Sequence, residues 1–153
     1  MDSSPEQTPA EQVKAHLHAA FDSQIPNFAS YNLVAAPGNA GASGLKVIGY
    51  RQQPAELVIA PVHPVTLTAS ESAITINNTN VNQLALLSDG AFEITLSTGR
   101  MLRFSVPPYP SIDFQADDAV SVSAVIDQEI DAHDFAEFME RFMDAIEGTE
   151  DFV

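Results

Sequence analysis

Apolar and polar residues alternate with a period of two through most of residues 31–106, which is the pattern of half-buried β-strands. Turn residues recur at short intervals, as they do between antiparallel strands rather than in strand–helix–strand units. An antiparallel sheet is therefore expected at the centre of the fold, and the helices must pack against it. The alternation predicts strands at residues 31–36, 45–51, 56–62, 73–78, 82–87, 92–97 and 101–106.

The segment before this region has the start signal of a helix. Thr8 is the expected N-cap, Pro9 occupies the first helical position and Glu11 completes a capping box. Apolar residues then recur at helical spacing, which predicts an amphipathic helix over residues 9–23. Its apolar stripe consists of Val13, Leu17, Ala20 and Phe21.

A second amphipathic helix is predicted over residues 131–147. Asp131 is the expected N-cap, and Gly148 is the expected C-terminal stop. The apolar stripe fits one face of a helix that covers the open side of the sheet. Its members are Phe135, Phe138, Met139, Phe142 and Ile146.

The register of one hairpin can be predicted from its apolar residues. A two-residue turn at Thr98-Gly99 would place the apolar residues of the two strands on opposite faces. A three-residue loop with Gly99 in the left-handed conformation places them on the same face. The predicted pairs are Phe92 with Phe104, Ile94 with Leu102 and, on the solvent side, Glu93 with Arg103, which makes Arg103 a structural residue.

Prolines at 107, 108 and 110 are expected to interrupt the sheet, because proline cannot donate to a central ladder. The pattern of the following segment, residues 120–130, predicts one last strand with one buried face and one solvent-exposed face. The expected buried side consists of Val120, Val122, Ala124, Ile126 and Ile130.

Together these patterns predict one α+β domain: an N-terminal helix, an antiparallel sheet of about seven or eight strands curled into a partial barrel or sandwich, and a C-terminal amphipathic helix packed on it. Its expected extent is residues 9–147, with a disordered N-terminus at 1–8 and a frayed acidic tail at 148–153.

The chain has no cysteine, no secretory signal pattern and no apolar run long enough to span a bilayer. A cytoplasmic location is therefore expected.

The net charge of −15 is concentrated near the C-terminus. Residues 113–153 contain thirteen acidic residues and only Arg141 as a cation, whereas residues 31–112 are balanced. Such a field disfavours nucleic acid and anionic membranes, and it favours solubility or a basic protein partner.

No catalytic or cofactor-binding motif is present, so no catalytic residue and no cofactor are predicted. The acidic run from Asp127 resembles a calcium loop, but Ala132 and Phe138 occupy the positions that require glycine and glutamate. His133 and Glu137 lie one helical turn apart, but two residues do not make a metal site. No metal is therefore predicted.

The methionine-containing C-terminal helix favours either core packing or an adaptable binding surface. Core packing is the favoured interpretation for most of the stripe, and Met143 is the best candidate for an exposed contact. The predicted partner-binding residues are Met139, Glu140, Met143, Asp144 and Glu147.

Two resemblances follow from these segments. The segments "DGAFEITLSTGRMLRFSV" and "DAHDFAEFMERFMDAI" resemble the end of a pleckstrin-homology-like domain, over about residues 30–147. The uncharged loop "PGNAGASG" departs from the basic loop of lipid-binding members, so this resemblance implies protein interaction rather than inositol-phosphate binding. Size, acidity and the ending "VSVSAVIDQEIDAHDFAEFMERFMDAI" also resemble small acidic type III secretion chaperones, which implies a non-enzymatic, often dimeric protein that binds a partner chain.

The sequence therefore favours a non-catalytic protein-interaction module, an adaptor or chaperone-like protein, with a possible homodimer. The alternative is a small-ligand-binding or enzymatic domain with a pocket in the curled sheet. A third hypothesis is an acidic mimic of nucleic acid, which predicts a charged face and steep salt dependence.

Overall fold

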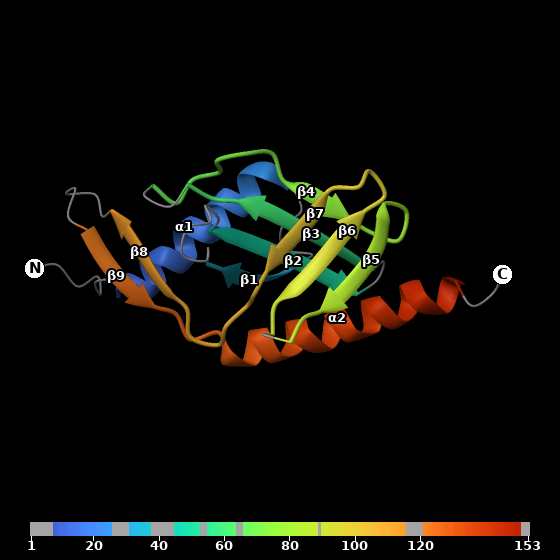
Figure 1. The fold of residues 1–153 in the computed structure, drawn as a ribbon. Coiled ribbons are helices and arrows are strands. Elements are labelled where there is room, and N and C mark those ends of the chain that lie inside the picture. Colours follow the sequence, from blue (N-terminus) through green and yellow to red (C-terminus); the bar gives the residue numbers. More distant parts are fainter. Residues whose placement is uncertain are drawn as a thin grey trace, which may run out of the picture.

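A computed structural model describes residues 8–25, 31–37, 45–52, 55–63, 66–88, 90–115 and 121–150 (Figure 1). The side chains of residues 114–115, 121–122 and 147–150 are outside this description. The described elements are α1 (Pro9–Gln24), β1 (Asn32–Ala36), β2 (Lys46–Gln52), β3 (Ala55–Pro61), β4 (Ile74–Ile76), β5 (Val81–Leu86), β6 (Phe92–Leu96), β7 (Met101–Phe104), β8 (Ser111–Gln115), β9 (Ser121–Val125) and α2 (Glu129–Glu150).

The α+β class and the antiparallel pairing are confirmed, but the strands form three sheets rather than one. The orders are β1-β2-β3-β4, β5-β6-β7 and β8-β9, and none of these sheets closes into a barrel in the described part of the chain. Figure 1 shows β5–β7 lying across the four-stranded sheet, with α2 running along one end of both sheets.

The four-stranded sheet is buried on both faces. Along β2, Ile48 and Tyr50 belong to one apolar core. Val47 points to the opposite face and belongs to another core, together with Leu45 just before the strand. The first core is shared with β5–β7 and with the apolar stripe of α2. The second core is shared with α1 and with the β8–β9 hairpin. Burial on both faces explains why β2 and β3 contain continuous apolar runs rather than a clean alternation.

The predicted start of α1 is confirmed. The Thr8 hydroxyl accepts a hydrogen bond from the Glu11 backbone N–H at 3.2 Å, and the Glu11 carboxylate accepts one from the Thr8 N–H at 3.0 Å. The helix packs directly on β2 at Gly49, because a Cβ there would lie 2.3 Å from Cζ of Phe21. Glycine is therefore required at this position by the close approach of α1.

The predicted hairpin register is also confirmed. Phe92 pairs with Phe104, Ile94 with Leu102 and Glu93 with Arg103. Gly99 has a φ of +92°, the left-handed conformation that the three-residue loop requires.

The prediction of a single last strand over residues 120–130 is wrong. Only Ser121–Val125 forms a strand, and it pairs with β8, a strand that the sequence did not predict. Prolines lack an N–H but still accept hydrogen bonds, so pairing continues past the strands. The carbonyl of Pro110 accepts from the Ile126 N–H, and that of Pro108 accepts from the Gln128 N–H, both at 2.9 Å.

Both predicted ends of the C-terminal helix are also wrong. The helix begins at Glu129, because the Gln128 carbonyl already accepts the Ala132 N–H at 2.7 Å, which places Asp131 in the first turn. Ile130 is consequently 82% exposed instead of lying on a buried strand face. At the other end the helix continues through Gly148 to Glu150, since a glycine stops a helix only where it leaves the helical conformation.

Candidate functional site

The exposed side of α2 carries a row of charged side chains. Its residues recur at helical spacing, so they form one continuous stripe along the helix. We call this stripe the acidic face; it consists of His133, Glu137, Glu140, Arg141 and Asp144.

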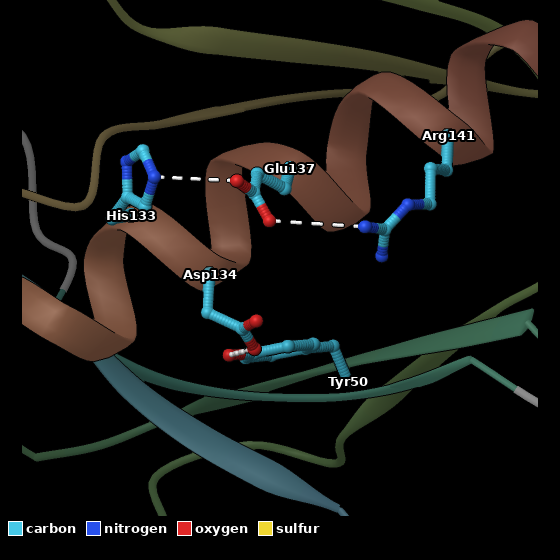
Figure 2. A network of polar contacts seen from close by, with 5 residues as sticks. All are labelled: Tyr50, His133, Asp134, Glu137 and Arg141. Carbon is cyan, nitrogen blue, oxygen red and sulfur yellow. Dashed lines mark hydrogen bonds and ion pairs between the residues drawn. The ribbon is translucent and has the colours of Figure 1, made fainter.

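Glu137 balances the single arginine of the acidic face. Its carboxylate lies 3.2 Å from Nε2 of His133 and 3.7 Å from a guanidinium nitrogen of Arg141, and all three side chains project from the same side of the helix (Figure 2). No ion pair within the described residues joins Glu140 or Asp144 to a cation. These two carboxylates are therefore accessible to an external cation.

The opposite side of α2 contacts the sheet through Tyr50, which lies within an aromatic cluster. The Tyr50 hydroxyl donates to Oδ2 of Asp134 at 2.7 Å (Figure 2). The Tyr50 ring lies 5.2 Å from the rings of both Phe135 and Phe138, measured between centroids. Burial, followed by the hydrogen bond to Asp134, raises the pKa of Tyr50 well above its usual range. Tyr50 therefore stays neutral and orients the helix.

The start of α2 is fixed by Gln128, a buried residue that sequence reasoning missed. Its side-chain amide exchanges two hydrogen bonds with the backbone of Ala35 on β1 and donates a third to the Pro107 carbonyl. Lying between Asp127 and Glu129, Gln128 belongs to a polar run, so the sequence contains no signal for its burial.

The predicted partner-binding residues fall into two groups. Met139 is fully buried in the first core, and Met143 is half-buried against the same core. Glu140 and Asp144 are exposed on the acidic face, whereas the Glu147 side chain is outside the described residues. The accessible part of the predicted set is therefore acidic rather than apolar.

A second feature that can bind a ligand is the open end of the space between the two larger sheets. A cavity of about 440 Å³ lies there, lined by residues of β2, β3, β4, β7 and their connecting loops. Lys46 and Arg100, which are far apart in the sequence, both line it. No pattern in the sequence predicts that these two cations lie near one cavity.

The described residues contain no group of three or more His, Asp or Glu side chains arranged to hold a metal ion. His133 and Glu137 contact each other, as their spacing allows, and no third metal-binding side chain joins them. Neither α1 nor α2, as far as the structure describes them, combines the length and hydropathy needed to cross a bilayer.

Comparison with known proteins gives no relative from which a role could be transferred. No protein-family model matches the chain, and no curated protein or solved structure is significantly similar to it.

Proposed function

We propose that this protein is a non-catalytic interaction module that binds a basic segment of a partner protein along the acidic face of α2. The observation that carries the proposal is the pair of exposed carboxylates of Glu140 and Asp144, one helical turn apart, neither of which forms an ion pair within the described residues, since Arg141 pairs with Glu137. Carboxylates in this arrangement attract lysine or arginine side chains and accelerate association.

The rigidity of the helix supports the same proposal. Phe135, Phe138 and Phe142 anchor α2 in the core, and Gln128 fixes its first turn. A surface that is fixed before binding loses little conformational entropy when a partner docks. Ile130, 82% exposed at the start of the helix, offers an apolar contact about 21 Å from Asp144 at the helical rise per residue.

The resemblance to pleckstrin-homology-like domains is part of the same proposal, because it too implies an interaction role. A four-stranded antiparallel sheet, a three-stranded antiparallel sheet and a C-terminal helix follow one another along the chain. The helix α1 and the hairpin β8–β9 are additions to that plan, and both cover the second core.

The test is partner capture by chemical cross-linking over a series of salt concentrations. Wild type is compared with Glu140→Lys/Asp144→Lys and with a control that has the same change in net charge, Asp22→Lys/Asp113→Lys. We expect wild type and the control to capture the same partner at low salt and the α2 variant to lose it. Equal loss in both variants would show that only net charge matters, and no partner at any salt concentration would overturn the proposal.

Sedimentation of the same three proteins tests the homodimer that the sequence left open. A wild-type dimer that the α2 variant alone changes would make a second copy of the chain the partner.

A further inference from the structure

The two larger sheets share an apolar interior that α2 covers at one end only. At the covered end, Tyr50 of β2 contacts Asp134 and Phe135. At the other end of β2, Lys46 lines the cavity of about 440 Å³, and none of the described side chains of α2 contributes to that cavity. The volume lies within the range of about 300–1,000 Å³ that is usual for small-molecule sites.

The inner wall of this cavity is apolar and comes from both sheets. Ile59 and Ile74 project from the four-stranded sheet, and Leu102 projects from β7 of the three-stranded sheet. Ile74 and Leu102 are only partly buried, so each keeps apolar surface that a ligand can cover. Covering that surface favours binding through the hydrophobic effect.

The rim of the cavity carries two of the chain's six lysine and arginine residues. Lys46 is the first residue of β2, and Arg100 directly precedes β7, so each of the two sheets contributes one cation. Glu71, from the loop before β4, also lines the cavity, which leaves a formal charge of +1 among the three groups. In a chain of net charge −15, a locally positive opening of this kind is selective for an anion.

Burial lowers the pKa of Lys46, because the half-buried ammonium has lost part of its hydration. An anionic group beside this ammonium would offset that loss and return the pKa toward its usual value.

We propose that this cavity binds an amphiphilic anion, with its charged head between Lys46 and Arg100 and its apolar tail against Ile59, Ile74 and Leu102. The shared chemistry is one carboxylate or phosphate head on an unbranched apolar chain. The site is separate from the acidic face. The proposed anion binding can therefore be tested independently of the proposed protein partner.

The first test is a calorimetric titration of the full chain with sodium decanoate and with decyl phosphate, below their micelle concentrations. Acetate provides the head without the tail, and 1-decanol provides the tail without the charge. We expect one equivalent of at least one decyl anion to bind and both control ligands to bind at least about tenfold more weakly, because acetate lacks the apolar tail and 1-decanol lacks the charged hydrogen bond. The tighter of the two decyl anions identifies the head.

Variants then locate the site. Lys46→Gln and Arg100→Gln should each weaken binding of the decyl anion by about tenfold. The matched control is Arg103→Gln, which changes an exposed arginine on the opposite face of β7, across from Glu93. Any of three results would overturn the proposal. 1-Decanol could bind as tightly as the decyl anions, neither decyl anion could bind, or all three variants could bind the decyl anion as tightly as wild type does.

Discussion

The side-chain amide of Gln128 pairs with the backbone of Ala35 in the way that a neighbouring strand would. The Ala35 N–H donates to Oε1 of Gln128, and Nε2 of Gln128 donates to the Ala35 carbonyl, both at 2.9 Å. Ala35 lies on β1, the edge of the four-stranded sheet, so the contact covers one pair of edge hydrogen-bonding groups. It also ties the start of α2 to a residue 93 positions earlier in the chain.

We expect Gln128→Met to lower the free energy of unfolding by about 3 kcal/mol, because it keeps the length of the side chain but leaves buried backbone groups without partners. Urea denaturation measures the change. The control is Gln83→Met at an exposed position of β5, where we expect a change within about 0.5 kcal/mol. Equal effects at the two positions would contradict the role assigned to Gln128.

Gly49→Ala should destabilise the protein by about 1–3 kcal/mol, because the new methyl group would overlap the Phe21 ring. The clash can be separated from a general intolerance of β2 by a double-mutant cycle. In a Phe21→Leu background, the smaller side chain at position 21 should reduce the cost of Gly49→Ala. An unchanged cost in that background would place the strain somewhere other than the α1–β2 contact.

Phe142→Ala should lower the free energy of unfolding by about 3–5 kcal/mol, because the ring is buried in the first core beside Phe138. Met143→Ala should cost about 1 kcal/mol, since its side chain is only half-buried at the edge of that core. Thermal melts followed by circular dichroism compare the two. A larger cost at Met143 would mean that α2 is rotated relative to the sheet.

Alkaline pH should destabilise the protein through Tyr50. Its pKa in the folded state is raised, so the unfolded chain releases the Tyr50 proton first as pH rises, and the free energy of unfolding falls above about pH 10, the ordinary pKa of tyrosine. The stabilising contribution is fully present below that pH. Tyr50→Phe should be less stable than wild type at neutral pH and should lose less stability above pH 10.

Urea denaturation across the alkaline range measures both effects. The control is Tyr109→Phe, because Tyr109 is exposed and bonded only to the exposed Glu129 in the described structure. Burial also raises the pKa of Tyr31, to about 12, so a residual alkaline dependence is expected in the Tyr50 variant. A Tyr50→Phe profile parallel to that of wild type would contradict the assignment.

Features set by neighbouring residues could be predicted from the sequence. The capping box joins Thr8 to Glu11, three positions away, and the hairpin loop joins strands through Gly99. The register of Phe92 with Phe104 followed from the requirement that apolar residues share one face. The burial of the α2 stripe followed for the same reason.

Features that depend on distant parts of the chain could not be predicted. The sequence analysis did not predict that β8 pairs with β9, because three prolines precede β8 and because the burial of Ile112 and Ala124 depends on the core that they share with α1. Nor did it show that Ile130 is exposed, since the helix begins at Glu129, two residues before its predicted start, and therefore includes Ile130.

The sequence by itself determined the two helices, the first seven strands and their order, the antiparallel pairing of one hairpin and the acidic character of the last helix. These depend on side-chain periodicity and on contacts within a few residues. Only the tertiary structure decided that both faces of the central sheet are covered, that Gln128 closes an edge at Ala35, and that Lys46 and Arg100 share one cavity. Those relationships join residues far apart in the chain, and their free energy comes from burial and hydrogen bonding that exist only after the layers have packed.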